Sequence, residues 1–137
     1  MAVEERDIQA MCAQLGREVR GVVEVAHRCK CGNPDVVKTF PRLENGTPFP
    51  TTYYVTCPRL TSRIGTLEAD GVMKQLEEKL ASDAELQAQY LLAHKSYLQD
   101  REALGQVPEI ENISAGGMPT RVKCLHVLVG HSLAKGP

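Results

Sequence analysis

Residues 19–40 read VRGVVEVAHRCKCGNPDVVKTF, and this stretch decides the fold class. The run at 19–29 is β-branched and alternating, and a second apolar run follows at 35–40. Runs of this kind on either side of a Gly-Asn-Pro turn predict two strands joined as a β-hairpin. Because the turn follows directly, Cys29 and Cys31 are expected at the tip of that hairpin.

Helical patterns surround the hairpin. Residues 4–15 carry apolar side chains at helical spacing, with acids in the first turn and a glycine stop. A proline-rich loop at 41–52 leads into a third strand at 52–57. The remaining helices are expected from Pro58 to a break at Asp70, over 72–81, over 82–104 with a Ser82–Glu85 capping box, and, after a linker at 105–117, over 119–134.

These elements predict an α+β fold, with a small antiparallel sheet of about three strands packed with four to five helices. A chain of 137 residues with 42% apolar and 24% charged residues is expected to form a single domain over residues 1–137. The formal net charge of −1 gives no reason to expect nucleic-acid or membrane binding. The acidic start MAVEERD lacks the pattern of a secretion signal, so we expect a cytoplasmic protein.

The cysteines are the main candidates for chemistry. Their number, five, is odd, which a fully paired disulfide framework cannot use, and reducing cytoplasm keeps cysteines as thiols. Cys12 lies on an apolar helical stripe and is expected in the core. Thiolates bind zinc and iron–sulfur clusters. The best four-ligand set for such a metal is Cys29, Cys31, Cys57 and Cys124.

Helix geometry selects among the ligands near the end of the chain. In a helix that starts at residue 119, Cys124 and His126 lie about 160° apart around the axis, so one metal would not take both. Cys124 and His131 share a face but stand about 10.5 Å apart along the axis. Two alternatives to a metal remain open for the hairpin cysteines, namely inert packing and a reactive or redox thiol.

Cations at two predicted helix starts suggest a bound anion. They are Arg59, Arg63, Arg121 and Lys123. A cation at a helix N-terminus typically costs about 0.3 to 1 kcal/mol. A small anionic ligand would compensate, with Gly116 and Gly117 letting backbone N–H groups approach it and Arg42 as a further clamp. The alternative is that these cations are solvated surface charges paired with acids such as Glu68 and Glu109.

The same positive field would make Cys124 a better nucleophile, with His131 as its catalytic neighbour. The sequence therefore supports two functions. The first is a metal-binding protein that holds zinc or an iron–sulfur cluster through clustered cysteines. The alternative is a protein, or a small enzyme, that binds a phosphorylated or carboxylated metabolite. No dinucleotide fingerprint, paired-carboxylate motif or Ser-His-Asp order is present, and the sequence leaves open whether the protein is an enzyme.

Two long blocks carry a resemblance to a known family. They are RCKCGNPDVVKTFPRLENGTPFPTTYYVTCPRL at 28–60 and SAGGMPTRVKCLHVLVGHSLAKGP at 114–137. At these blocks the chain resembles the bacterial family called domain of unknown function number five hundred and one. The resemblance implies a cytosolic bacterial protein of no established activity, often encoded near an exopolyphosphatase-type gene and a septum-formation gene. It also implies a native C-terminal tail beyond Pro137.

Overall fold

The computed structural model describes residues 2–136 and shows a three-stranded antiparallel sheet in the order β1-β2-β3, with five α-helices. The elements are α1 (Glu5–Leu15), β1 (Val22–Arg28), β2 (Pro34–Thr39), β3 (Tyr53–Val55), α2 (Pro58–Ala69), α3 (Val72–Ser82), α4 (Ala84–Leu104), η1 (Pro108–Ile110) and α5 (Leu125–Lys135). The predicted α+β class, hairpin and third strand are confirmed. Within residues 2–136, no helix is both long and apolar enough to span a membrane.

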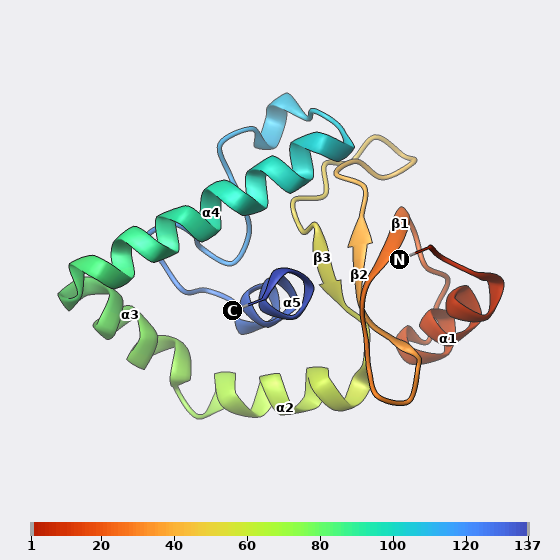
Figure 1. Ribbon diagram of the computed structural model, residues 1–137, viewed down its shortest axis with the longest axis horizontal. Helices are drawn as coiled ribbons and strands as arrows, with labels where there is room; N and C mark the ends of the chain where they lie inside the picture. Colours follow the sequence, from red (N-terminus) through yellow and green to blue (C-terminus); the bar gives the residue numbers. More distant parts are fainter. Residues whose placement is uncertain (1, 137) are drawn as a thin grey trace.

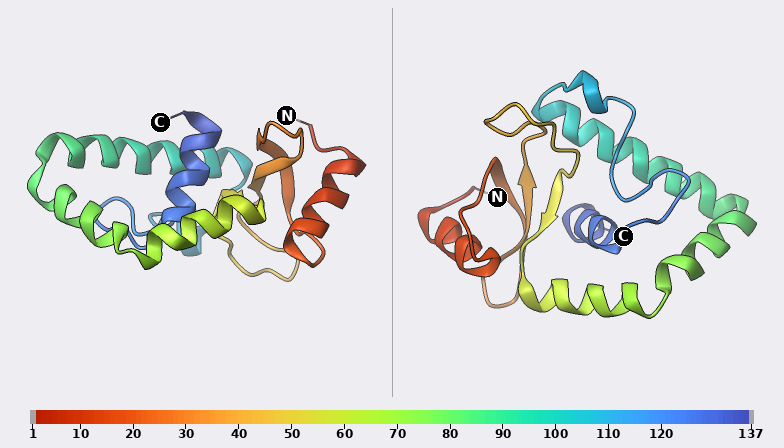
Figure 2. Two further views of the ribbon diagram at one scale, coloured as in Figure 1. Left: turned by 90° about the horizontal axis from the view of Figure 1, so that it is seen from below. Right: turned by 180° about the vertical axis from the view of Figure 1, so that it is seen from behind.

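The sheet is covered on both faces, because successive side chains along a strand point to opposite sides. Val25 and Val37 are paired across β1 and β2, and they pack with Met11 of α1. On the other face, Val36 and Val55 are paired across β2 and β3 and belong to the larger core around α5. Figure 1 and Figure 2 show α1 and α5 on opposite sides of the sheet.

Helix α5 lies at the centre of the larger core, and α2, α3 and α4 follow one another around it (Figure 1). The helix approaches β3 closely at Gly130. A Cβ atom at this position would lie 2.9 Å from the backbone oxygen of Tyr53, so only glycine fits without a shift. The N–H of Leu125 at the start of α5 donates to Glu68 near the end of α2, which brings these two helix ends together.

The predicted capping box at Ser82 is wrong. Ser82 is the last residue of α3, and its hydroxyl donates to the carbonyl of Glu78. The N-cap of α4 is Asp83, whose carboxylate accepts from the N–H of Leu86 at 3.0 Å. Aspartate is as good an N-cap as serine, and here it is the residue with the extended backbone that a cap requires.

The predicted start of the last helix at residue 119 is also wrong. Helix α5 begins at Leu125, and Cys124 is its N-cap, with an extended backbone of φ −151° and ψ 119°. Two N–H groups of the segment 119–124 donate to the carbonyls of the Gly116-Gly117 turn at 2.8 Å each. Because these groups are already bonded to the turn, the segment takes a non-helical path into α5.

A buried ion pair joins α1 to the hairpin. The carboxylate of Asp7 accepts from Arg28 at 2.7 and 2.9 Å and from the N–H of Glu4 at 3.0 Å. Only 2% of Asp7 is exposed. The Arg28 guanidinium, aided by the Glu4 N–H, holds the pKa of this carboxyl well below its usual range.

Acid is therefore expected to destabilise the protein through Asp7. A carboxyl whose pKa is depressed in the folded state contributes stability above its unfolded pKa of about 3.9, and this is lost as the pH falls through the folded pKa. We expect the urea midpoint to fall below pH 4 in the wild type and to fall less in Asp7→Asn. Asp70→Asn, at an exposed carboxyl, is the matched control. Equal pH dependence in the wild type and Asp7→Asn would contradict this role.

Candidate functional site

Three side chains of metal-ligand type meet where the end of α2 reaches the start of α5. Glu68 lies in the last turn of α2, Cys124 caps α5, and His126 lies in the first turn of α5. Nδ1 of His126 lies 3.3 Å from Oε1 of Glu68 and 3.9 Å from Sγ of Cys124. Over residues 2–136, this is the only group of three such residues whose ligand atoms all lie within 4.8 Å of one another.

The carboxylate of Glu68 is held in place by the backbone of α5. Its Oε2 accepts from the N–H of Leu125 at 3.0 Å, which leaves Oε1 facing His126. A carboxylate at a helix N-terminus is favourable, because it satisfies an unpaired N–H and lies at the positive end of the helix dipole. Glu68 therefore acts as an external cap for α5 and presents one free oxygen to the site.

The position of Cys124 outside the helix overturns the argument that excluded His126. That argument placed both residues in a helix, about 160° apart around its axis. The extended backbone of Cys124 instead lets its sulfur lie near Nδ1 of His126. The residue beside Cys124 is thus His126, two positions along the chain.

Side chains from α3 and α4 fix the segment that leads to Cys124. Glu77 of α3 accepts from Nε of Arg121 at 2.8 Å and from the N–H of Val122 at 3.0 Å. The hydroxyl of Tyr90 of α4 donates to the carbonyl of Arg121 at 2.7 Å. The hydrogen bond from Arg121 lowers the pKa of Glu77, and burial raises the pKa of Tyr90 to about 12. Glu77 therefore stays ionised and Tyr90 stays a donor near neutral pH.

The other three cysteines predicted as metal ligands lie away from Cys124. Cys29, Cys31 and Cys57 line an open pocket of about 830 Å³, and Cys124 is not part of its lining. Cys57 caps the start of α2, whereas Cys124 lies beside the end of that helix. A helix of 12 residues is about 18 Å long. The structure therefore brings three of the four predicted metal ligands to one pocket and places Cys124 away from it, beside Glu68 and His126.

Cys29 and Cys31 lie next to each other within this pocket. The backbone N–H of Cys31 donates to Sγ of Cys29 at 3.1 Å. The hydrogen bond with the Cys29 thiol lowers the pKa of Cys31, and the same interaction raises the pKa of Cys29. Cys31, which is exposed, is therefore the thiol of the pair that ionises first.

Cys31 is expected to be alkylated faster than Cys29 and Cys12 by iodoacetamide at pH 7.5, because the thiolate is the reacting species. Cys29→Ala removes the hydrogen bond that favours the Cys31 thiolate, so it should slow the alkylation of Cys31. Peptide mass spectrometry over a time course measures each rate, with the half-buried Cys12 as an internal reference. Faster labelling of Cys29, or an unchanged Cys31 rate in Cys29→Ala, would contradict the assignment.

Two of the predicted anion-binding cations form ion pairs with acids. Arg42 contacts Glu109 at 2.7 Å, and Arg121 contacts Glu77 at 2.8 Å. At Arg42 the structure thus shows the alternative reading, a surface charge paired with an acid such as Glu109. These pairs neutralise both guanidinium groups, so neither presents a free charge to an anion.

The other predicted anion ligands lie apart from one another. Arg59 and Arg63 line the pocket of the three hairpin-side cysteines, and Lys123 is exposed just before Cys124. Gly116 and Gly117 have left-handed φ angles of 68° and 90°, and their carbonyls accept from the following segment. The Gly116-Gly117 turn therefore holds the segment that leads into α5. Lys123 lies before this helix rather than in its first turn.

His131 is buried in the core, further along α5 than Cys124. Its ring stacks on Tyr53 with centroids 5.5 Å apart and meets Tyr97 edge-on at 5.1 Å. Burial lowers the pKa of His131, which keeps the ring neutral near pH 7. The structure does not bring His131 to the sulfur of Cys124, from which it is separated by about 10 Å of helix.

Sequence reasoning excluded His126 as a partner of Cys124 and did not consider Glu68 as one. The signal for His126 is the Cys-x-His spacing at 124–126, which places both side chains near one point whenever the cysteine lies outside the helix. No local pattern marks Glu68, because its role depends on how α2 meets α5. Only the three-dimensional packing identifies it.

Comparisons with known proteins identify the family. No curated protein and no solved structure matches the chain. A family model described as "Protein of unknown function (DUF501)" matches residues 25–137, which include the whole sheet apart from the start of β1, and helices α2 to α5. The match covers most of the chain and both blocks that carried the resemblance, so this protein belongs to the DUF501 family of proteins of unknown function.

Proposed function

We propose that this protein binds a zinc ion through Glu68, Cys124 and His126. The observation that carries the proposal is the distance between the ligand atoms. Zinc bonds of about 2.0 to 2.3 Å at tetrahedral angles separate neighbouring ligand atoms by about 3.3 to 3.8 Å. The measured separations are 3.3 Å from His126 to Glu68 and 3.9 Å from His126 to Cys124. Shifts of a few tenths of an ångström would bring these two pairs to coordination distance, and the ligand atoms of Glu68 and Cys124 lie within 4.8 Å of each other.

The chemistry of the ligands selects the metal. Zinc accepts thiolate, imidazole and carboxylate ligands, whereas an iron–sulfur cluster takes mainly cysteine thiolates. This group offers one thiolate, so it favours zinc over a cluster. A cation such as Zn²⁺ is unfavourable at the positive end of α5. The negative charges of the thiolate and the carboxylate together balance the charge of the ion.

Three protein ligands leave a fourth position for water or for an external ligand. Open positions of this kind are typical of catalytic zinc sites, and closed sites with four protein ligands are typical of structural ones. All three side chains are partly exposed, so solvent reaches the site. The proposed ion would also join α2 to α5, and it would stabilise the packing of these two helices in either role.

Zinc titration against a chromophoric chelator tests the proposal. We expect one equivalent of Zn²⁺ per chain, and a rise in thermal stability that corresponds to about 2.7 kcal/mol at a free zinc concentration of 100 times Kd. Co²⁺ should give a thiolate charge-transfer band that is absent in Cys124→Ser. Failure to bind one equivalent, or a band that persists in Cys124→Ser, would overturn the assignment.

A second candidate is favoured by the pocket of Cys29, Cys31 and Cys57. Arg59 and Arg63 line the same pocket, so a small anion could bind beside the thiols. Iodoacetate and iodoacetamide differ mainly in charge, and their relative rates at Cys31 report this attraction. If the pocket attracts anions, the ratio of iodoacetate to iodoacetamide rates should fall in an Arg59→Met, Arg63→Met double variant. An unchanged ratio would remove this candidate.

A triple variant distinguishes the cysteine-based metal site predicted from the sequence from the proposed site at Glu68. With Cys29, Cys31 and Cys57 all replaced by serine, the site at Glu68 should still bind one equivalent of zinc. Loss of zinc or iron from this variant, with Cys124→Ser unaffected, would instead place the metal in the thiol pocket. The two experiments together assign any bound metal to one end of α2.

A further inference from the structure

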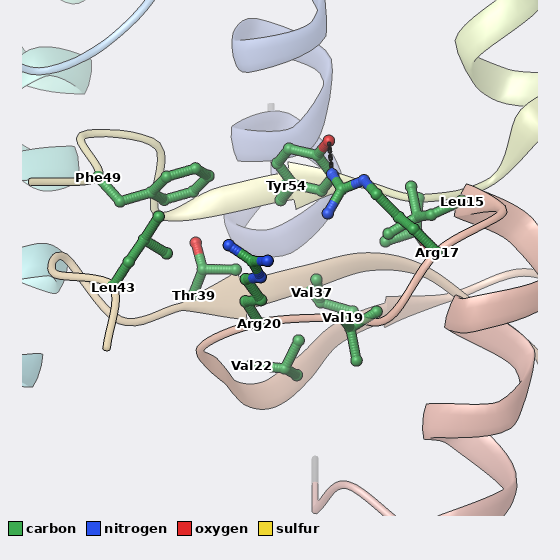
Figure 3. Close-up of a pocket in the computed structure, with 11 residues that line it drawn as sticks. Leu15, Arg17, Val19, Arg20, Val22, Val37, Thr39, Leu43, Phe49 and Tyr54 are labelled. Atoms are coloured by element: carbon green, nitrogen blue, oxygen red, sulfur yellow. Dashed lines mark hydrogen bonds between the residues drawn. The ribbon is translucent and has the colours of Figure 1, made fainter. Parts of the chain in front are cut away.

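The face of the sheet that carries α1 has a hollow of about 210 Å³. Figure 3 shows its floor and walls, which come from the sheet, from the segment after α1 and from the proline-rich loop. Apolar side chains make up most of the lining: Leu15, Val19, Val22, Val37, Leu43 and Phe49. The hollow lies on the opposite face of the sheet from α5, so it is separate from the proposed zinc site.

The polar groups of the floor are already bonded to the protein. The hydroxyl of Thr39 donates to the carbonyl of Thr51, and the hydroxyl of Thr56 donates to the carbonyl of Pro34. They therefore offer little to a polar ligand. The floor would favour an apolar ligand body, because such a body removes the lining from water without leaving a polar group unpaired.

Two cations stand at the rim above this apolar floor. Arg17 donates to the hydroxyl of Tyr54 at 3.3 Å, and Figure 3 shows the guanidinium of Arg20 beside Thr39, directed across the hollow. Within residues 2–136, neither guanidinium has a carboxylate partner, in contrast to Arg28, Arg42 and Arg121. Two unneutralised guanidinium groups over an apolar floor are complementary to a molecule with one anionic end.

We propose that this hollow binds a small amphipathic carboxylate. The apolar body lies on Val22 and Val37, between Leu43 and Phe49, and the carboxylate accepts hydrogen bonds from Arg20 and Arg17. The hydroxyl of Tyr54 keeps Arg17 at the rim. A hollow of about 210 Å³ limits the ligand to a short aliphatic chain or a single aromatic ring.

Octanoate is a suitable probe, with 1-octanol as its uncharged counterpart and acetate as the anion without an apolar body. Titration of the full chain is followed by amide chemical shifts, with Val37 and Tyr54 reporting from the floor of the hollow. We expect octanoate to saturate one site and to shift these amides, and acetate to leave them unchanged. Failure of octanoate to saturate, or shifts confined to the surroundings of Cys31 or Cys124, would overturn the proposal.

Arg20→Met removes the charge and keeps an unbranched apolar side chain. We expect the Kd of octanoate to rise about 10- to 100-fold, the range for losing a hydrogen bond to a charged group. The Kd of 1-octanol should stay the same. Lys95→Met, which removes an exposed cation from α4, is the matched control and should leave both values unchanged. Equal octanoate affinity in the wild type and Arg20→Met, or an equal loss in Lys95→Met, would contradict a carboxylate site here.

Discussion

Zinc affinity is expected to fall by more than about 100-fold in each of the variants Cys124→Ser, His126→Gln and Glu68→Gln. Each variant removes a proposed direct ligand, and loss of even an outer hydrogen-bond partner commonly costs about 10- to 100-fold in metal affinity. The replacements keep the size and polarity of each side chain. In Glu68→Gln the amide oxygen still accepts from the N–H of Leu125, so the packing of α2 on α5 is retained.

Competition with a chromophoric chelator measures these affinities, and circular dichroism shows whether each variant is folded. Cys12→Ser and Cys57→Ser are the matched controls, because they remove a thiol at a distance from the group of Glu68, Cys124 and His126. Both should bind zinc like the wild type. Zinc affinity should also fall with decreasing pH, because all three proposed ligands would bind the metal in their deprotonated forms. A Glu68→Gln variant with wild-type affinity would limit the site to two ligands and contradict the proposal.

The sheet could be predicted from the sequence because its signals are local. Strands β1 and β2 are joined by a short turn, and the alternation of apolar residues fixes which side chains face α1. The signals for both ends of α2 are equally local. Pro58 is well suited to the first position of a helix, and Asp70-Gly71 marks its end. None of these features depends on contacts with distant parts of the chain.

The start of α5, in contrast, depends on contacts with distant parts of the chain. The pattern after residue 119 is compatible with a helix, but the N–H of Val122 donates to Glu77, and the carbonyl of Arg121 accepts from Tyr90. Both partners lie more than 30 positions earlier in the chain. Tertiary hydrogen bonds therefore override the local preference and delay the helix to Leu125.

The error in the helix start carried over to the site. Because Cys124 was expected inside the helix, His126 was excluded as a ligand. The remaining cysteines then became the expected partners of Cys124. The distance between Cys57 and Cys124 is set by the length of α2, because they lie at opposite ends of this helix. Cys124 and His126 could thus be identified from the sequence as residues of metal-ligand type, but the inclusion of Glu68 and the grouping of the three required the packing of α2 against α5.

Tyr97→Ala is expected to lower the free energy of unfolding by about 3 to 5 kcal/mol, the usual cost of removing a large buried aromatic ring. Tyr97 is fully buried, and its ring meets Tyr53 edge-on at 5.7 Å and His131 edge-on at 5.1 Å. Its hydroxyl accepts from the N–H of Thr52 at 2.7 Å. One side chain of α4 therefore supports both the start of β3 and the middle of α5.

Tyr97→Phe separates the hydrogen bond from the packing. The ring stays, but the buried N–H of Thr52 loses its acceptor, which typically costs about 1 to 3 kcal/mol. Tyr90→Phe is the control on the same helix, because its hydroxyl bonds to the carbonyl of Arg121 at the surface and its loss should cost less. Urea unfolding followed by circular dichroism gives all three values. If Tyr97→Phe were as stable as the wild type while Tyr97→Ala lost several kcal/mol, ring packing alone would hold α4 to the sheet, and the bond to Thr52 would contribute nothing.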